Sequence, residues 1–199
     1  MGDRHTREGA SGLIEIDGTR IAPPLTAGQA RSLGAFGLLA DEPENMLEVW
    51  HRVVWTWAAE LDAAKQDPGE ARLGDRVDGE WSLVETLRHL RFVTDGWIGR
   101  GVLGSDEYHP LGLPPDFVTN GRELGLRLDA EPDLETVLVA RTEGQQLVAR
   151  ALEGASNLDS PCLGPLSAFT LRGAFQVVIA EEWFHLGFAR RDLGRLRSP

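Results

Sequence analysis

The sequence is poor in cysteine and in long apolar runs, and each shortage excludes a class of protein. Its 199 residues include one cysteine, Cys162, so no internal disulfide can form. Cys162 lies in the loop-like segment SPCLGP without a neighbouring histidine to activate its thiol, which argues against a catalytic cysteine. No apolar run reaches the roughly 18 residues of a membrane span, and the N-terminus lacks the apolar core of a signal peptide. We therefore expect a cytoplasmic protein that does not enter a membrane.

Positive charge is scarce as well. The formal net charge is −11, and no basic stripe is present that would attract the phosphates of a nucleic acid. Lys65 is the only lysine, and this preference for arginine is typical of a GC-rich genome such as that of an actinobacterium. With 42% hydrophobic residues, the chain can form one well-buried domain and a short appendage. The composition predicts a one-domain protein with no nucleic-acid partner.

Four segments have the apolar spacing and the boundary signals of helices. The first predicted helix covers about 43–65 and ends before the Pro68-Gly69 pair. The second begins after Ser82, whose spacing to Glu85 is that of a capping box, and its apolar face continues to Ile98. The third and fourth predicted helices cover about 133–153 and 170–196. This content predicts an all-α fold.

The connections between these helices predict a four-helix bundle. About 30 residues rich in glycine and proline separate the second helix from the third, a length that suits a crossover between two parallel helices. Ahead of the first helix, LIEIDGTRIA alternates around Asp17-Gly18 and predicts a short hairpin. We divide the chain into a flexible tail (1–12), a hairpin or extended segment (13–40) and the bundle (41–197).

Two titratable residues interrupt the apolar face of the fourth predicted helix. Glu181 and His185 fall among apolar residues that share one side of this helix, namely Ala174, Val177, Val178, Phe184 and Phe188. A lone carboxylate buried there would cost several kcal/mol, so it should have a partner, and a metal ion shared with His185 suits the i, i+4 spacing. His89 on the second helix is the candidate third ligand. Such a set leaves an open position and suits zinc, nickel, iron or manganese.

The residues also allow an interpretation without a metal ion. Glu181 could pair with an arginine such as Arg191, while His185 and His89 bond to backbone or water. The remaining histidines, His5, His51 and His109, are expected to be structural or solvated, although His109 could line the mouth of a site. Of the six tryptophans, Trp55 and Trp183 are expected to lean outward.

Three sequence blocks together resemble the DinB-like superfamily of metal-binding bundles, especially an actinobacterial branch. They are DGEWSLVETLRHLRFVTDGWIGRGVLG, YHPLGLPP and VIAEEWFHLGFARRDL, and GLIEIDGTRIAPPL resembles the segment that precedes the bundle in that branch. The resemblance implies an up-down-down-up bundle with ligands at His89, Glu181 and His185. Many members have histidine at position 181, and the His, Glu, His pattern is similar to the zinc site of mycothiol-dependent maleylpyruvate isomerase.

This resemblance leads to three functional hypotheses. The first is a transferase in which the metal ion binds a small thiol such as mycothiol, lowers its pKa and lets it attack an electrophile. On this hypothesis Glu182, at the helix edge, or Asp192 could orient the metal ligands. The second is metal-assisted hydrolysis at the same ion. The third is a non-catalytic, metal-stabilised bundle that acts in a stress response and pairs as a homodimer through exposed helix faces.

Overall fold

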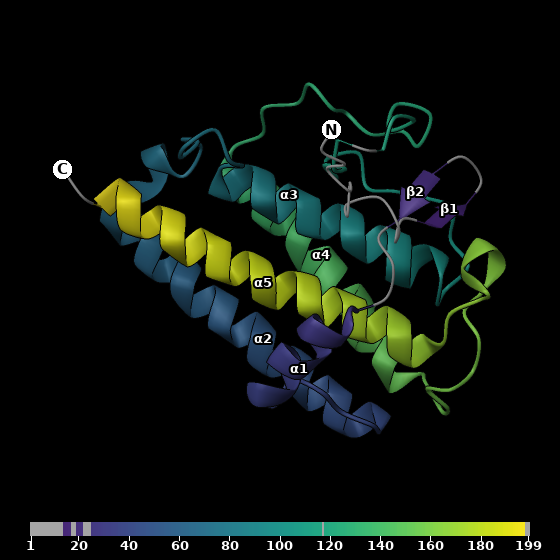
Figure 1. The fold of residues 1–199 in the computed structure, drawn as a ribbon. Coiled ribbons are helices and arrows are strands. Elements are labelled where there is room, and N and C mark those ends of the chain that lie inside the picture. The colour runs from purple at the N-terminus through teal and green to yellow at the C-terminus, as the bar shows by residue number, and fades with distance from the viewer. Residues whose placement is uncertain (1–13, 17–18, 22–24, 117, 198–199) are drawn as a thin grey trace, which may run out of the picture.

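The structure is a computed structural model that describes residues 14–16, 19–21, 25–116 and 118–197 (Figure 1). Four long helices form most of it: α2 (Pro43–Ala64), α3 (Leu83–Thr94), α4 (Leu134–Glu153) and α5 (Leu171–Arg197). The shorter elements are β1 (Ile14–Ile16), β2 (Thr19–Ile21), α1 (Ala27–Ala35), π-helical turns at Lys65–Gly69 and Asp95–Arg100, and 3-10 turns at Glu70–Arg72 and Gly164–Leu166. Apart from two three-residue strands, the described chain has the predicted all-α content.

The four long helices pack as a bundle. α3 packs against α4 and α5, and α2 packs against the same two helices, so their apolar faces enclose one core (Figure 1). The largest side chains of this core that are almost completely buried are those of Trp50, Trp57 and Phe175. Burial of aromatic side chains of this size removes a large apolar area from water and is a main source of stability.

Helix starts follow the predicted capping chemistry. The Ser82 hydroxyl accepts a hydrogen bond from the Glu85 amide at 3.2 Å, and the Glu85 carboxylate accepts one from the Ser82 amide at 2.9 Å. α4 begins in a similar way, because the Asp133 carboxylate accepts a hydrogen bond from the Thr136 amide at 2.8 Å. These contacts satisfy amides that have no partner inside the first turn of a helix.

The segment 13–40 contains a helix that we did not predict. β1 and β2 pair antiparallel, as expected for a hairpin, and the tail 1–12 and Asp17-Gly18 lie outside the described residues. α1 follows, and its capping box joins Thr26 to Gln29. The expectation of only a hairpin or extended chain was therefore wrong for 27–35, because we overlooked this capping box in a short segment with a weak apolar face.

The long crossover between α3 and α4 is held to α3 by a buried arginine. Arg88 is 5% exposed, and its guanidinium donates to the carbonyl oxygens of Leu111, Arg127 and Ala130 at 2.9, 3.1 and 2.7 Å. A second, smaller apolar cluster fixes the same loop to α3; it consists of Phe92, Tyr108, Val118 and Leu126. The loop is thereby placed beside the middle of α3, where His89 lies.

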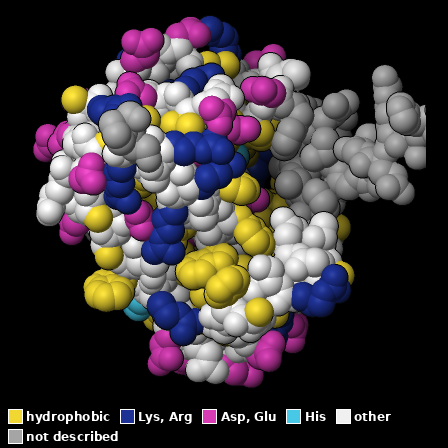
Figure 2. Space-filling view, turned by 60° about the vertical axis from the view of Figure 1, so that its left-hand side comes forward, with side chains coloured by type: hydrophobic (Ala, Val, Ile, Leu, Met, Phe, Trp, Pro, Cys, Tyr) yellow, Lys and Arg dark blue, Asp and Glu magenta, His cyan; other side chains and the backbone are white. Residues whose placement is uncertain are grey.

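The surface offers few clues to a macromolecular partner. On the face drawn in Figure 2, basic and acidic side chains are interspersed, and no continuous basic stripe is seen among the described residues. Within the same part of the chain, no helix has both the length and the apolar character needed to cross a membrane. Cytoplasmic location and the absence of nucleic-acid partners stay predictions.

Candidate metal centre

The fold brings the three predicted ligands together between α3 and α5. His89 comes from α3, and Glu181 and His185 lie one turn apart on α5. One potential ligand atom from each residue lies within 4.8 Å of those of the other two. The Glu181 Oε2 atom is 3.5 Å from Nε2 of His89 and 3.4 Å from Nδ1 of His185, and the two imidazole centroids are 4.9 Å apart.

Both imidazoles are oriented by backbone carbonyls. Nδ1 of His89 donates to the carbonyl of Leu113 at 3.1 Å, and Nδ1 of His185 donates to the carbonyl of Glu181 at 2.9 Å. Because a carbonyl oxygen can only accept, each Nδ1 carries the proton, and Nε2 of the neutral ring keeps its lone pair. An outer hydrogen bond of this kind is what metal-binding histidines usually make. The donor set present therefore fits a divalent ion.

The electrostatics of the cluster favour the ligand forms of two residues. Burial lowers the pKa of His185, and the neighbouring His89 lowers it further, so its neutral imidazole is favoured. Burial by itself would raise the pKa of Glu181, but the hydrogen bond from His89 and the charges of His185 and His89, which act when these rings are protonated, outweigh it and lower this pKa, so the ionised carboxylate is favoured in the metal-free cluster. A neutral imidazole and an ionised carboxylate are the protonation states that a metal ion requires.

The alternative arginine partner of Glu181 is not observed. Arg191 binds its neighbour Asp192 instead, with Nε and Nη2 donating to the two carboxylate oxygens at 2.7 and 2.8 Å. The backbone contacts of His89 and His185 that this interpretation expected are present, but they serve a metal ligand equally well. Among the described residues, the side-chain partners of Glu181 are the two histidines.

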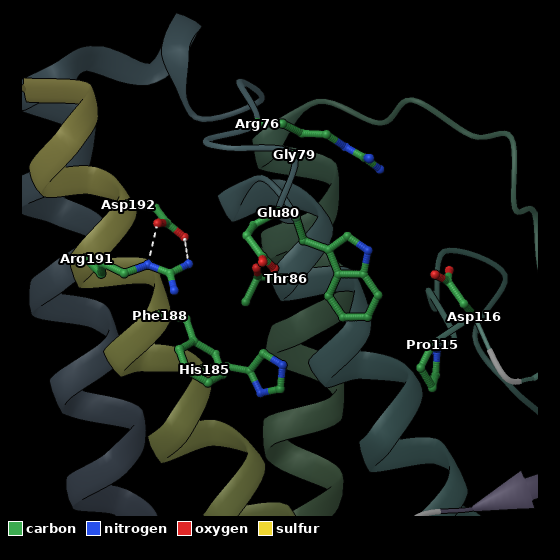
Figure 3. A pocket seen from close by; sticks show the side chains of 11 residues that line it. Arg76, Gly79, Glu80, Thr86, Pro115, Asp116, His185, Phe188, Arg191 and Asp192 are labelled. Atoms are coloured by element: carbon green, nitrogen blue, oxygen red, sulfur yellow. Dashed lines mark hydrogen bonds and ion pairs between the residues drawn. The ribbon is translucent and has the colours of Figure 1, made fainter. Parts of the chain in front are cut away.

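A cavity of about 650 Å³ lies beside the triad. His185, Phe188 and Asp192 line it from α5, and Pro115 and Asp116 of the crossover loop lie opposite them (Figure 3). This volume is within the range of ordinary small-molecule sites. The loop that supplies the Leu113 carbonyl to His89 therefore also forms one wall of the cavity.

Glu182 has a different place from the one predicted. It is 2% exposed and faces Arg141 of α4, whose guanidinium donates to its two carboxylate oxygens at 3.0 and 2.6 Å. The helix-edge position was therefore wrong. Asp192 does line the cavity, but its carboxylate binds Arg191 and not a triad residue. The groups that orient the ligands are the carbonyls of Leu113 and Glu181, for which no side-chain pattern exists.

Two aromatic residues of α5 also correct the predicted apolar face. Phe188 is 51% exposed, not buried, and its ring meets the His185 ring edge-on at 5.6 Å. Trp183 is half-buried against Phe36 of the segment after α1, with ring centroids 5.1 Å apart, so its outward lean is only partial. Trp55 is 74% exposed, which confirms its predicted outward position.

The other histidines stand apart from the triad. His51 is exposed on α2, and His5 lies outside the described residues. His109 accepts a hydrogen bond from the Leu111 amide at 3.2 Å and lines a separate cavity of about 430 Å³ near α4, so it does not line the mouth of the cavity beside the triad.

Comparison with known proteins identifies the family. The chain belongs to the DinB superfamily, whose family model matches residues 52–189 and so covers more than half of it. The match includes all three residues of the triad. No curated protein and no solved structure shows significant similarity to the chain. The comparisons therefore define the class of protein, and the site must indicate its chemistry.

Proposed function

We propose that the protein binds one divalent metal ion through His89, Glu181 and His185 and uses it to transfer a small thiol, with mycothiol as the first candidate, to an electrophilic substrate. The observation that carries this proposal is the convergence of three donors beside an open cavity. Zinc suits two imidazoles and one carboxylate best, and nickel, iron or manganese also accept this set.

The chain supplies the geometry for such an ion. The Leu113 carbonyl fixes the ring of His89 and the Glu181 carbonyl fixes that of His185, so both Nε2 lone pairs are available without a change of tautomer. When bound, the ion would act as a Lewis acid that lowers the pKa of a sulfur or an oxygen. Three protein ligands leave a position for that exchangeable group.

The cavity supports an exchangeable site over a purely structural one. A structural ion is typically enclosed by four protein ligands, whereas the described residues within reach of this cluster are three and a cavity adjoins His185. Metal-assisted hydrolysis would use the same ion and the same cavity. We favour thiol transfer because the His, Glu, His pattern resembles that of a mycothiol-dependent isomerase, and the experiment below separates the two.

The up-down-down-up helix order forms part of the same proposal. Two contacts support it, because each joins the starts of two helices that would run parallel. At the start of α5, Arg172 donates to the carbonyl of Asp41, which precedes α2, at 2.6 Å. Arg88, in the first half of α3, donates to the carbonyl of Ala130, which precedes α4, at 2.7 Å.

The proposal is tested by metal analysis and calorimetry on the full chain. The purified protein should hold about one divalent ion per chain, as expected for a three-ligand site. His185→Ala should remove the ion, while His51→Ala, a change of the same type at an exposed histidine, should leave it in place. Mycothiol should bind the metal-loaded protein and not the metal-free protein.

Two results would overturn the proposal in different ways. A stoichiometric ion in a triple alanine variant of His89, Glu181 and His185 would reject the metal site. Equal affinity of mycothiol for both forms would reject thiol activation by the ion and would leave hydrolysis as the better hypothesis.

A further inference from the structure

Arg88 is a buried cation that holds backbone carbonyls and not a carboxylate. It lies on α3 and is 5% exposed. All three nitrogens of its guanidinium group donate to the crossover loop, at the carbonyls of Leu111, Arg127 and Ala130. Within the described residues Arg88 forms no ion pair, and Glu85 attracts its charge without contacting it. Burial of such a cation is costly, and an apolar side chain would avoid the cost but could not hold three carbonyls, which points to a role for the loop geometry.

The part of the loop that Arg88 holds also orients a metal ligand. The Leu113 amide donates to the Arg88 backbone carbonyl at 3.1 Å, and the Leu113 carbonyl accepts the hydrogen bond from Nδ1 of His89 at 3.1 Å. Leu111, whose carbonyl the Arg88 guanidinium binds, precedes Leu113 by one residue between them. The position of the carbonyl that His89 needs is therefore determined by the same short stretch of chain that Arg88 fixes to α3.

Two aromatic rings support His89 but do not replace this hydrogen bond. The Trp81 ring lies against the imidazole with centroids 4.7 Å apart, and the Phe92 ring stacks on it at 6.5 Å. Such contacts restrict where the imidazole lies, but they do not determine which nitrogen carries the proton. The Leu113 carbonyl keeps the proton on Nδ1 and so leaves the lone pair on Nε2, the nitrogen that is 3.5 Å from Oε2 of Glu181.

We propose that Arg88 is a positioning residue of the metal centre. By holding the crossover loop it fixes the Leu113 carbonyl, and through this carbonyl the tautomer and the orientation of His89. The same loop contributes Pro115 and Asp116 to the wall of the cavity (Figure 3), so metal affinity and the order of this wall are coupled, and the coupling acts in both directions. The inference rests on the metal site of the proposed function and does not depend on the thiol.

The first test compares two arginines that hold backbone carbonyls. Arg88→Met removes the donors to the crossover loop, and Arg172→Met makes the same change at the start of α5, where Arg172 donates to the Asp41 carbonyl at 2.6 Å and does not line the cavity. Zinc affinity of the full chain is measured by competition with a chelating dye, at a temperature where circular dichroism shows both variants folded. We expect a loss of about 10-fold or more in Arg88→Met, as is typical for an outer contact of a metal site, and of less than about 2-fold in Arg172→Met. Unchanged affinity in Arg88→Met, or equal losses in the two variants, would overturn the inference.

Cobalt(II) provides a readout that a loss of stability alone does not change. The visible absorption bands of the cobalt-loaded protein depend on the geometry and the identity of the ligands around the ion. These bands should shift or weaken in Arg88→Met, because His89 is no longer held in place, and should be those of the wild type in Arg172→Met. A wild-type spectrum in Arg88→Met would show that His89 keeps its position without Arg88, and the inference would be overturned.

Amide hydrogen exchange of the wild type tests the reverse effect, and it needs no variant that folds. In the crossover loop the Leu113 amide donates to the Arg88 carbonyl, and in the loop before α5 the Cys162 amide donates to the Phe169 carbonyl. Saturating zinc should slow exchange of the Leu113 amide about 10-fold or more relative to that of Cys162, because the ion holds the His89 ring to which Leu113 is bound. Equal slowing at both amides would show that zinc acts only on the stability of the whole fold, and the coupling would be rejected.

The outcomes distinguish this inference from the proposed function. If the wild type binds neither zinc nor cobalt, the metal site is rejected, and the role of Arg88 is rejected with it. If the wild type binds one ion with the same affinity and the same cobalt spectrum as Arg88→Met, the metal site stands and only the positioning role is rejected.

Discussion

Two consecutive glutamates of α5 occupy opposite environments. Glu182 is 2% exposed and forms a two-fold ion pair with Arg141, while its carbonyl accepts a hydrogen bond from the Trp57 indole at 3.1 Å. Glu181 points toward α3 and has the imidazoles of His89 and His185 as partners. Successive residues of a helix lie about 100° apart, so the two carboxylates point in different directions. Glu182 lies in the closed side of the bundle, where α5 packs against Arg141 of α4, and Glu181 lies in its open side, next to the cavity.

The two glutamates differ in role because their partners differ: an arginine for Glu182 and two histidines for Glu181. A guanidinium is always charged, so Arg141 neutralises Glu182 permanently, and the Trp57 ring packs over the guanidinium at 4.9 Å. An imidazole can be neutral, so the partners of Glu181 offer lone pairs to a shared ion instead. A buried charge with a permanent counter-ion is a structural element, whereas one beside neutral nitrogen donors is a candidate site.

The largest expected effect concerns the closed side. Arg141→Met should lower the free energy of unfolding by about 3–5 kcal/mol, because it leaves the Glu182 carboxylate buried and unpaired. Arg141→Met combined with Glu182→Leu should recover most of this loss, since no uncompensated charge remains. Urea denaturation measures both, and a double variant as unstable as the single one would show that the ion pair itself is needed for stability.

The corresponding change on the open side should affect the metal ion and not the fold. Glu181→Leu should lower metal affinity at least about 100-fold, more than the loss of a supporting contact does, while the free energy of unfolding changes by no more than about 1 kcal/mol. Glu181→His should keep the ion, since an imidazole is also a suitable donor. Metal analysis and circular dichroism check both variants. A full equivalent of ion in Glu181→Leu would show that Glu181 is not a required ligand.

The pH dependence of the metal-free protein sharpens the contrast. The pKa of His185 in the folded state is below its ordinary value of 6.5. As the pH falls below 6.5, this residue therefore binds a proton more readily in the unfolded chain than in the folded one. Stability should therefore be constant well above pH 6.5 with respect to this group and decrease as the pH falls below that value. The lowered pKa of Glu181 acts in the same direction, below its ordinary value of 4.5. His185→Asn should flatten the decrease near pH 6, and His51→Asn should not.

The smallest expected effect concerns Asp192 at the rim of the cavity. Asp192→Asn should change the free energy of unfolding by less than about 1 kcal/mol, because Arg191 is 43% exposed and water screens its pair with Asp192. Metal content should not change, since no triad residue contacts this carboxylate. Weaker metal binding in this variant would restore the hypothesis that Asp192 orients the ligands.

The helix boundaries show how far local chemistry determines this fold. The capping box of Ser82 and Glu85 predicts the start of α3, because both bonding partners lie within four residues of each other. The same signal at Thr26 and Gln29 marks α1, but this helix is short and its apolar face is weak, so the capping box is the main local signal for it. Local signals were sufficient in both places.

In the candidate site too, some features follow from local sequence and others from tertiary contacts. By itself, the sequence determined the helical content, the i, i+4 pair of Glu181 and His185 and His89 as their candidate partner, because helical spacing and the cost of a buried charge are local properties. Only the tertiary structure decided that the Leu113 carbonyl holds His89 and that Glu182 faces Arg141. These contacts join residues 24 and 41 positions apart, and they depend on how the crossover loop and α4 pack, which no local pattern encodes.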